Sequence, residues 1–342
     1  MTVTASPSQI AYEEKNPLHE LYILFSDKII KVDQCLDAYA YSDVRALPLI
    51  SKHIISSGGK RIRPLLTLAA ASLCGYTEGD RDVSLAACIE FLHTATLLHD
   101  DVVDESKLRR GAPTAHTLWG NQMSVLTGDF LFSKLFQQLI ADGDLNVLKL
   151  FSETTQKIIE GEVLQISARS NSNLSKEDYF LIIELKTALL FGAALELGGM
   201  VAEASQKQSQ ALKTYAYNIG MAFQLIDDVL DYTASEPKLG KPIGNDFFEG
   251  QPTLVLILLQ NRLRQNPTKL NQLQHILSAD CRSNDDFKWV QRLIHEHRID
   301  KEIYDLAETY VEQARTALYF FNDSPLRKVL ICLANFIVGR PN

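Results

Sequence analysis

From Pro17 onward, apolar residues recur every three or four positions, which is the spacing of an α-helix with one buried face. The segment "LHELYILFSDKIIKVDQCLDAYA" shows the pattern first, and "SVLTGDFLFSKLFQQLIA" and "LKTYAYNIGMAFQLIDDVLDY" repeat it. No stretch keeps the apolar–polar alternation of a half-buried strand. The sequence therefore predicts an all-α fold, a single-domain helical bundle over residues 17–342, preceded by a flexible N-terminal tail over residues 1–16.

The breaks between these helices are short and polar, with one exception. Ser175 followed by Asp178 resembles an N-terminal capping box and predicts the start of a helix. The longest break, "ASEPKLGKPIGNDFFEGQ" over residues 234–251, is rich in Gly, Pro and Lys. A loop of that length in a helical domain is more often functional than idle, so we expect it to take part in a site.

Composition narrows the compartment and the partners. The formal net charge of -8 argues against a general nucleic-acid binder, which needs a basic face. The five cysteines are scattered and have no metal-ligand spacing, as expected for reduced thiols. No signal peptide is recognisable, and no run reaches the roughly 18 apolar residues of a membrane span. We therefore expect a cytoplasmic protein with no nucleic-acid partner and no membrane span.

Three aspartates stand at the end of an apolar helix in "TATLLHDDVVDESKLRRG", residues 94–111. Asp100 and Asp104 are four positions apart and share a face, with Asp101 beside them. The negative end of a helix dipole disfavours further anions, so the cluster makes sense mainly if cations bind. Carboxylates without His or Cys partners select hard ions such as Mg²⁺. For one cluster alone, a solvated acidic helix end is an equally good interpretation.

A second cluster, Asp227, Asp228 and Asp231 in "FQLIDDVLDY", has the same spacing in another apolar helix. Two such clusters in one helical chain favour the metal interpretation. If they face each other across a bundle core, they could hold several Mg²⁺ ions around one polyphosphate.

Basic residues near glycines offer partners for such a polyphosphate, because arginine forks match phosphate oxygens and glycine permits close backbone approach. They are Lys60, Arg61 and Arg63 in "SSGGKRIRP", Arg109 and Arg110 in "KLRRG", and Lys186 and Lys241 further along. The glycine spacing in "GGKR" is not that of a P-loop. His93 lies about two turns before Asp100 on the same face and could reach the same cavity, although a lone His on an apolar helix is more often a packing residue.

Together, "GGKRIRP", "LLHDDVVDESKLRRG", "GDFLF", "GEVLQ", "KTALLF" and "FQLIDDVLDY…GKPIGND" resemble the trans-isoprenyl (polyprenyl) diphosphate synthases. The likeness covers about residues 20–340 and is greatest to bacterial long-chain octaprenyl, solanesyl and decaprenyl diphosphate synthases. It implies the isoprenoid synthase fold, with helices around a deep central cavity, and a homodimer. It also implies a prenyltransferase that uses Mg²⁺, about three ions per site, to condense an allylic diphosphate such as farnesyl diphosphate with isopentenyl diphosphate. Such all-trans products serve as quinone side chains, for instance in ubiquinone biosynthesis, and are membrane-seeking.

The resemblance also implies a role for each matching residue. Asp100, Asp101, Asp104, Asp227, Asp228 and Asp231 would surround the metals and the allylic diphosphate, and all but Asp231 would be metal ligands. Arg109, Lys186, Gln224 and Lys241 would contact the allylic diphosphate, and Lys60, Arg63, His93 and Arg110 would hold isopentenyl diphosphate. Thr187 would place a hydroxyl near the reacting carbons.

The segment "EGQPTLVLI" departs from the family pattern at two positions. Gln251 and Val255 stand where the family commonly has Lys and Pro. We expect Gln251 to weaken one diphosphate contact without abolishing activity.

Product length in this family depends on the residues just before the first aspartate cluster, where a bulky side chain blocks the growing tail. Ala95 and Thr96 are small, and a helix of some 25 residues provides ~37 Å of wall at about 1.5 Å per residue, room for a product of about C40 to C50. Phe130, Phe132 and Phe136 on the next helix could form a deeper floor. Plain core packing of these rings is at least as good an interpretation.

Four alternatives remain open. The chain could be a shorter-chain farnesyl or geranylgeranyl diphosphate synthase, which product size distinguishes. It could be a non-catalytic subunit of a heteromeric synthase, although such subunits typically lack intact aspartate motifs. His99 before Asp100 superficially suggests a helical metal phosphohydrolase, but that chemistry requires further His ligands. A head-to-head condensing synthase would not need the isopentenyl diphosphate site that "GGKRIRP" implies.

Overall fold

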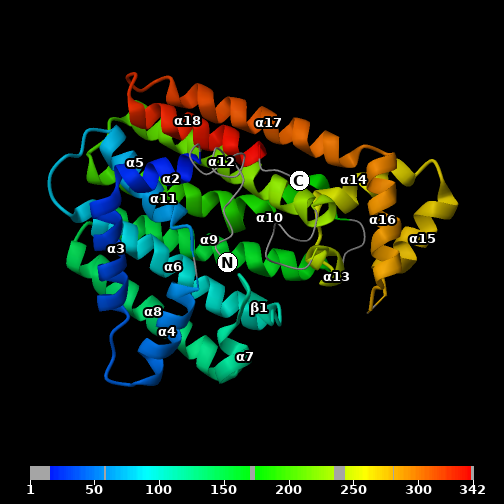
Figure 1. Cartoon of the computed structure of the whole chain (residues 1–342), viewed down its shortest axis with the longest axis horizontal. Coiled ribbons are helices and arrows are strands. Elements are labelled where there is room, and N and C mark those ends of the chain that lie inside the picture. The colour runs from blue at the N-terminus through cyan, green and yellow to red at the C-terminus, as the bar shows by residue number, and fades with distance from the viewer. Residues whose placement is uncertain (1–15, 58, 170–173, 235–242, 280, 340–342) are drawn as a thin grey trace, which may run out of the picture. The chain divides into compact units, whose positions relative to one another are not determined.

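The three-four spacing of apolar residues folds into helices throughout the described chain (Figure 1). The computed structural model describes residues 16–57, 59–169, 174–234, 243–279 and 281–339. The predicted all-α class is confirmed, and the two short strands of one hairpin are the only strands among these residues. Asn16 already caps the first helix by accepting a hydrogen bond from the Leu18 amide, so the predicted tail ends before it. The rest of that tail lies outside the described residues.

Contacts group the chain into two units, and each draws on separate stretches of sequence. Unit 1 takes residues 1–152, 191–216 and 314–336, and unit 2 takes residues 153–190, 217–313 and 337–342. Five helices contribute residues to both units: α9 (Leu145–Arg169), α11 (Leu189–Val201), α12 (Gln206–Thr233), α17 (Ile299–Leu318) and α18 (Pro325–Val338). Neither unit is therefore a continuous stretch of the chain. The single catalytic domain expected over residues 17–342 stays a prediction.

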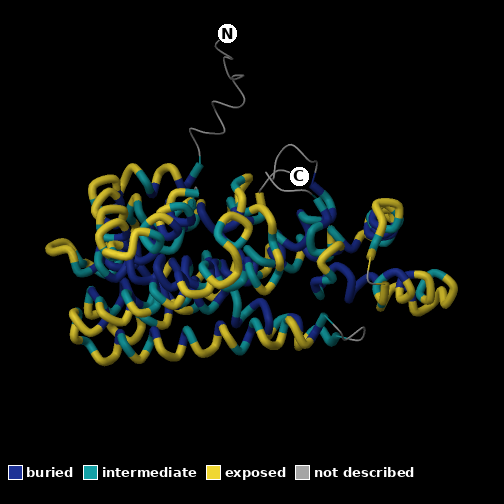
Figure 2. Tube along the Cα trace, turned by 90° about the horizontal axis from the view of Figure 1, so that it is seen from below, coloured by how far each residue is buried: buried dark blue, intermediate teal, exposed yellow. Residues whose placement is uncertain are grey.

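The core of unit 1 is α6 (Arg81–Val103), which is buried on every side over most of its length. It contacts α3 (Ser26–Tyr39), α4 (Ala46–Ser56), α5 (Ile62–Leu73), α7 (Ala115–Trp119) and α8 (Asn121–Asp142). Unit 1 also contains α2 (Pro17–Leu24) and most of α18 (Pro325–Val338). Figure 2 shows outer helices whose residues alternate between buried and exposed, as an amphipathic helix requires. A helix buried on most sides, such as α6, is the one that the others cover.

Glycine permits the closest helix contacts in unit 1. A Cβ on Gly128 of α8 would lie 2.3 Å from Nε2 of His99 on α6, so the His99 ring occupies this position only because Gly128 has no side chain. His99 in turn is 3.1 Å from the Val125 carbonyl oxygen and lies beside the Phe132 ring. These contacts make His99 a packing residue of the α6–α8 interface.

The segment after α6 forms a hairpin that the sequence did not predict. Strands β1 (Leu108–Arg109) and β2 (Ala112–Pro113) pair antiparallel across the two residues Arg110 and Gly111. Both turn residues have positive φ, 52° and 78°, as a two-residue hairpin turn matching the twist of the strands requires. Such a conformation costs a non-glycine residue of order 1 kcal/mol or more, and it points to a position where Arg110 serves function rather than stability.

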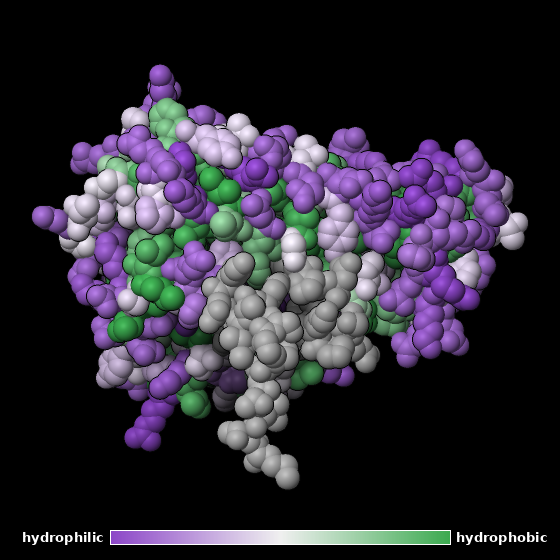
Figure 3. All heavy atoms as spheres, turned by 45° about the horizontal axis from the view of Figure 1, so that its top comes forward, coloured by the Kyte–Doolittle hydropathy of each residue, from purple (hydrophilic) through white to green (hydrophobic). Residues whose placement is uncertain are grey.

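Unit 2 contains α10 (Lys176–Ile183), a single π-helical turn η1 (Glu184–Ala188), α13 (Asn245–Phe248), α14 (Leu254–Leu263), α15 (Pro267–Leu277) and α16 (Asn284–Glu296). Ser175 accepts a hydrogen bond from the Asp178 amide, which confirms the predicted helix start. Figure 3 shows mainly hydrophilic side chains over the end of this unit that carries α15 and α16.

The π-turn η1 is positioned by two glycines on neighbouring helices of unit 2. A Cβ on Gly161 of α9 would lie 2.8 Å from the Leu185 Cβ, and one on Gly220 of α12 would lie 2.5 Å from the Ala188 Cα. Real Cβ atoms do not approach other atoms so closely, so each glycine is required by the contact. Single π-turns occur frequently at functional sites, and this one carries Lys186 and Thr187.

No helix among the described residues combines the length and the apolar character that crossing a membrane requires.

Replacing Gly220 with Ala tests this packing. We expect Gly220→Ala to lower the free energy of unfolding by about 1–3 kcal/mol, because the new methyl group overlaps the Ala188 backbone, which cannot move out of the way cheaply. Gly192→Ala on α11 is the matched control, since its Cβ would meet nothing within 4 Å. Removing a helix-interior glycine there should be neutral or stabilise by up to about 1 kcal/mol. Urea unfolding of both variants is the measurement, and equal midpoints would contradict the packing argument.

Candidate active site

The first aspartate cluster lies at the C-terminal end of α6, as the sequence predicts. Asp104 is the C-cap residue, and its amide donates to the Asp100 carbonyl oxygen at 2.8 Å. Asp101 is only 1% exposed, and its Oδ1 accepts from Nε and Nη2 of Arg109 at 2.8 and 2.7 Å. A predicted metal ligand and a predicted diphosphate ligand therefore neutralise each other. Binding a cation at Asp101 and an anion at Arg109 would replace this ion pair by two new ones.

The β1–β2 hairpin carries the two adjacent arginines, Arg109 on β1 and Arg110 in the turn. Gly59, in the segment before α5, lies under the guanidinium of Arg110. A Cβ on Gly59 would be 3.1 Å from Nη1 of Arg110, 3.3 Å from Nη1 of Arg61 and 3.5 Å from Oε1 of Glu90. Two arginines and one carboxylate thus gather at a glycine whose backbone they can approach closely.

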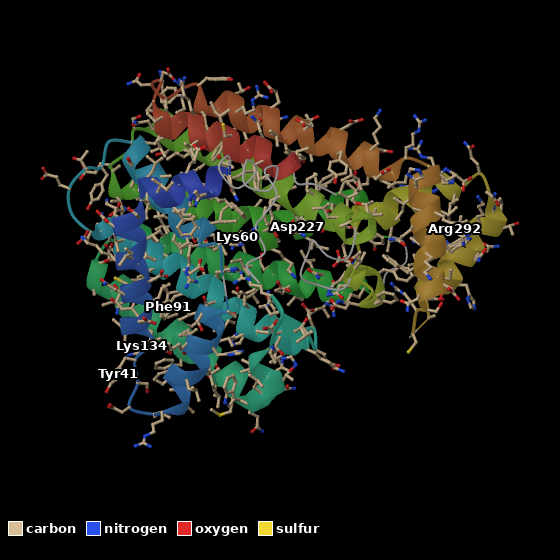
Figure 4. All side chains as sticks on the ribbon, in the orientation of Figure 1. Tyr41, Lys60, Phe91, Lys134, Asp227 and Arg292 are labelled. Atoms are coloured by element: carbon tan, nitrogen blue, oxygen red, sulfur yellow. The ribbon has the colours of Figure 1, made fainter. Side chains whose placement is uncertain are left out.

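Arg61 is engaged in ion pairs within unit 1. Its Nη1 donates to Oε1 of the buried Glu90 at 3.0 Å, its Nε donates to Asp33 at 3.1 Å, and its Nη2 donates to the Ile55 carbonyl oxygen. Its φ of 42° places it in the left-handed region at the start of α5. These partners fix the loop that carries Lys60, which Figure 4 labels just before α5.

Arg63 and His93 are basic residues of unit 1 whose pKa values are lowered by burial. Nε of Arg63 is buried and has no hydrogen-bond partner among the described residues, and its guanidinium lies 5.2 Å from the centre of the Phe191 ring. The pKa of Arg63 is lowered to about 10, chiefly by burial and also by nearby Arg110, although the Glu90 carboxylate opposes the shift. The pKa of His93 lies well below 6.5 because the ring is buried and Arg63, Arg109, Arg110 and Arg61 repel its proton. A neutral imidazole among four guanidinium groups is an environment suited to an anion.

The predicted chain-length residues lie on and beside α6. Ala95 is almost fully buried, and the Thr96 hydroxyl donates to the His93 carbonyl oxygen within the same helix. Phe132 on α8 lies beside His99, with ring centres 5.9 Å apart, which places it next to the turn that precedes Asp100. Phe136 is exposed, so it does not close a floor within unit 1. The deeper floor that these rings were expected to form stays a prediction.

The second aspartate cluster lies near the C-terminal end of α12, in unit 2, where Figure 4 labels Asp227. Asp228 is buried and accepts hydrogen bonds from the Tyr179 hydroxyl and the Gln224 amide, both at 2.7 Å. The pKa of Asp228 is raised to about 7, chiefly by burial and also by the neighbouring carboxylates Asp227 and Asp231, although its two hydrogen bonds oppose the shift. A bound cation would offset this accumulated negative charge.

Asp231 differs from the other two residues of its cluster. Its Oδ2 accepts a hydrogen bond from the Asp246 amide at 2.8 Å, and its carbonyl oxygen accepts one from the Gly244 amide. Asp231 therefore fixes the end of the long loop and the start of α13. This agrees with its omission from the predicted metal ligands.

Lys186 and Thr187 extend from the π-turn η1 toward other residues of unit 2. Nζ of Lys186 donates to Gln165 and forms an ion pair with Oε2 of Glu162 at 2.7 Å. The Thr187 hydroxyl donates to Oε1 of Gln224 at 2.7 Å, and Gln224 donates to Asp228. Gln224 thus connects the predicted reacting-carbon residue to the aspartate cluster, which is a positioning role in addition to the predicted diphosphate contact.

The long loop contributes less to the described structure than expected. Lys241, a predicted diphosphate ligand, lies outside the described residues. Gln251 and Val255 are buried after the loop, on the polypeptide that leads into α14. Gln251 accepts hydrogen bonds from Gln165 and Arg169 of α9.

The donor chemistry of both clusters fits a divalent cation, because each consists of carboxylates without nitrogen or sulfur ligands. Within the described ranges, no group of three or more His, Cys, Asp or Glu side chains is already arranged around a metal position. The fit therefore rests on residue type and on the neighbouring carboxylates that raise the pKa of Asp228. Which aspartates bind a metal stays a prediction.

Sequence reasoning missed four residues that hold the predicted ones in place: Glu90, Glu162, Gln165 and Tyr179. Glu162 and Gln165 lie in the "GEVLQ" motif, which contributed to the resemblance, but neither received a role. A spacing of three to four positions puts both on one face of α9, and this was the available signal. Tyr179 and Glu90 give no such signal, because each acts through a contact far away in the sequence.

Comparison with known proteins identifies the family. The family model for polyprenyl synthetase matches residues 44–294. The octaprenyl diphosphate synthase of Escherichia coli is 39% identical over 311 residues, which cover 87% of this chain and 91% of that protein. The geranylgeranyl diphosphate synthase of Saccharolobus solfataricus is 32% identical over 332 residues, which cover 94% of this chain and 98% of that protein.

Among solved structures, a polyprenyl synthase from Caulobacter crescentus complexed with calcium and isoprenyl diphosphate matches with a TM-score of 0.89 and 40% identity. The match covers 94% of this chain and 98% of that one. The predicted isoprenoid synthase fold and the predicted prenyltransferase class are confirmed. This chain belongs to the polyprenyl synthetase family.

Proposed function

We propose that this trans-prenyl diphosphate synthase condenses an allylic diphosphate head-to-tail with isopentenyl diphosphate, with Mg²⁺ as its divalent cation. The observation that carries the proposal is the set of basic residues around His93. Arg63 has a buried Nε without a hydrogen-bond partner among the described residues, and His93 is neutral among four arginines. A buried guanidinium nitrogen with no hydrogen bond is costly, and the oxygens of a diphosphate would supply both an acceptor and a negative charge. Lys60, Arg63, His93 and Arg110 are the proposed isopentenyl diphosphate ligands.

The allylic diphosphate is the proposed ligand of the aspartate-rich residues. Asp100, Asp101, Asp104, Asp227 and Asp228 would hold the Mg²⁺ ions, which neutralise the charge of the leaving diphosphate. Arg109 and Lys186 would bind the diphosphate oxygens. Both are already held by carboxylates, Asp101 and Glu162, so their charged groups are oriented before substrate arrives.

The reaction balances with these residues in place. The C1–O bond of the allylic diphosphate breaks, and its electron pair leaves with diphosphate. The double bond of isopentenyl diphosphate supplies the pair for the new carbon–carbon bond, and the released diphosphate takes the proton whose loss restores a double bond. Thr187, held by Gln224, would place its hydroxyl oxygen near the cationic carbons. Apolar walls are needed because water would capture the cation.

We propose a long all-trans product for quinone side chains, formed by a cytoplasmic homodimer. Small side chains at Ala95 and Thr96 support a long product, and the octaprenyl diphosphate synthase of Escherichia coli is consistent with it. The geranylgeranyl diphosphate synthase among the relatives keeps a shorter product as the second candidate. The first experiment is to incubate the chain with Mg²⁺, farnesyl diphosphate and labelled isopentenyl diphosphate and to size the dephosphorylated products. A ladder ending at about C40 to C50 supports the proposal, and a geranylgeranyl product supports the alternative.

Removing a carboxylate from either cluster should slow condensation. We expect Asp100→Asn and Asp227→Asn each to lower kcat by about 10²-fold or more, since each removes charge that would hold a metal against the leaving group. Excess EDTA should abolish activity, and added Mg²⁺ should restore it. Asp323→Asn, at an exposed ion pair with Arg327, is the control and should match the parent enzyme. Full activity of both cluster variants in EDTA would contradict the metal assignment.

Arg63 allows a separate test of the isopentenyl diphosphate site. We expect Arg63→Gln to raise KM for isopentenyl diphosphate about tenfold or more, because a charged hydrogen bond to phosphate is lost. KM for the allylic diphosphate should change little. The same substitution removes a buried guanidinium whose Nε makes no hydrogen bond to the described residues, so the free energy of unfolding should stay equal or rise. A lower stability with an unchanged KM would assign Arg63 to the core rather than to substrate.

A larger side chain at position 95 tests whether Ala95 helps to set the product length. If Ala95 lines the path of the growing tail, Ala95→Phe should shift the products to farnesyl or geranylgeranyl length without loss of the first condensation. Because Ala95 is almost fully buried, thermal unfolding should accompany the assay to detect overpacking. Thr96→Phe, on the less buried neighbouring position, is the second variant. An unchanged long product from both folded variants would show that another element sets the length.

A further inference from the structure

Four polar side chains in unit 2 form one connected network at the end of α9. Lys186 in η1 donates to Gln165 on α9, and Gln165 donates to Oε1 of Gln251. Arg169, the last residue of α9, donates through Nε to the same Oε1 at 3.4 Å. The network thus joins Lys186, a proposed diphosphate ligand, to a second cation that the family motifs do not include.

Spacing along α9 explains why these groups converge. Glu162, Gln165 and Arg169 follow one another at three and four positions, so they share one face of the helix. On that face, the Glu162 carboxylate pairs with Lys186, and the Gln165 amide accepts a hydrogen bond from Lys186. The Arg169 guanidinium follows at the C-terminal end of α9. Lys186 and Arg169 therefore lie on the same side of α9, connected through Gln165 and Gln251.

The amide of Gln251 is suited to hold Arg169, whereas a cation at this position would not be. Gln251 is buried, and its Oε1 is the acceptor for both Gln165 and Arg169. A lysine side chain has only donors, so it could not accept from either residue, and its charge would repel the guanidinium. The glutamine that departs from the family pattern is thus the residue that makes an arginine at position 169 favourable.

We propose that Arg169 is a further diphosphate-binding residue of this enzyme, oriented by Gln251 toward the anion that Lys186 binds. This inference rests on the proposed function, because it assigns Arg169 to the allylic diphosphate site of the same synthase. Arg169 supplies the cation, its planar guanidinium matches two phosphate oxygens, and Gln251 fixes its direction. The weakened diphosphate contact expected from Gln251 is then compensated by Arg169 from a different helix.

Steady-state kinetics with farnesyl diphosphate as the allylic substrate test the assignment. We expect Arg169→Gln to raise KM for farnesyl diphosphate about tenfold or more, with kcat and KM for isopentenyl diphosphate within about twofold. Arg169→Lys keeps the charge and should recover most of the affinity. Arg262→Gln is the matched control, since Arg262 forms a surface ion pair with Glu302 in the same unit and should leave all constants unchanged.

The double variant, Arg169→Gln with Gln251→Lys, tests whether a cation at position 251 can replace Arg169. Adding Gln251→Lys to Arg169→Gln returns one cation to the network and should restore KM for farnesyl diphosphate to within about threefold of the parent. Gln251→Lys alone places two cations side by side and should not improve KM. An unchanged KM in Arg169→Gln, or no recovery in the double variant, would overturn the proposal.

Binding of inorganic pyrophosphate separates this inference from the proposed function. Isothermal titration in Mg²⁺ should give about tenfold weaker pyrophosphate binding for Arg169→Gln than for the parent, whether or not the chain elongates a prenyl chain. Equal pyrophosphate affinities in the folded proteins would overturn the role of Arg169. An inactive parent that still shows the affinity difference would refute the synthase proposal and retain the anion site. If Arg169→Gln does not fold, Arg169→Lys and the double variant carry the test.

Discussion

Compensation of buried charge is the constraint on which the functional parts of this protein depend. Asp101 is buried at the end of α6 and is balanced by Arg109 from the hairpin. Asp228 is buried in α12 and is held by the Tyr179 hydroxyl and the Gln224 amide, with its pKa raised to about 7. Nε of Arg63 is buried and has no hydrogen-bond partner among the described residues. Charges placed in this way are costly in the protein alone, and they are the groups that a metal–diphosphate ligand would satisfy.

Close packing turns these residues into fixed positions. Gly128 lets α8 approach His99 on α6, one residue before the first aspartate cluster. Gly161 and Gly220 fix the π-turn that carries Lys186 and Thr187. In each case a glycine leaves the space that a neighbouring residue occupies.

Gln251, which departs from the family motif, has a structural role as a hydrogen-bond acceptor. From the sequence, the change from Lys to Gln indicates only a lost charge. The described hydrogen bonds show an acceptor between Gln165 and Arg169, on the same network as Lys186. The proposal for Arg169 follows from that geometry. In this proposal, Arg169 on α9 supplies the positive charge that a lysine at position 251 would otherwise supply, so the total charge of the site is unchanged.

The sequence by itself determined the helical class, the helix end at the first aspartates and the start of α10 at Ser175. Its motifs also indicated the family. Apolar spacing, capping residues and short motifs are local signals, so they can be recognised without the tertiary structure. It did not determine the β1–β2 hairpin, because Arg110 precedes Gly111 where Asn, Asp or Gly is usual, and tertiary context holds this arginine in its left-handed conformation. It also did not determine that Glu90, Tyr179 and Gln165 hold the site residues, or that Arg61 is an ion-paired anchor. Those assignments depend on side chains that are distant in sequence, and only folding decides which of them meet.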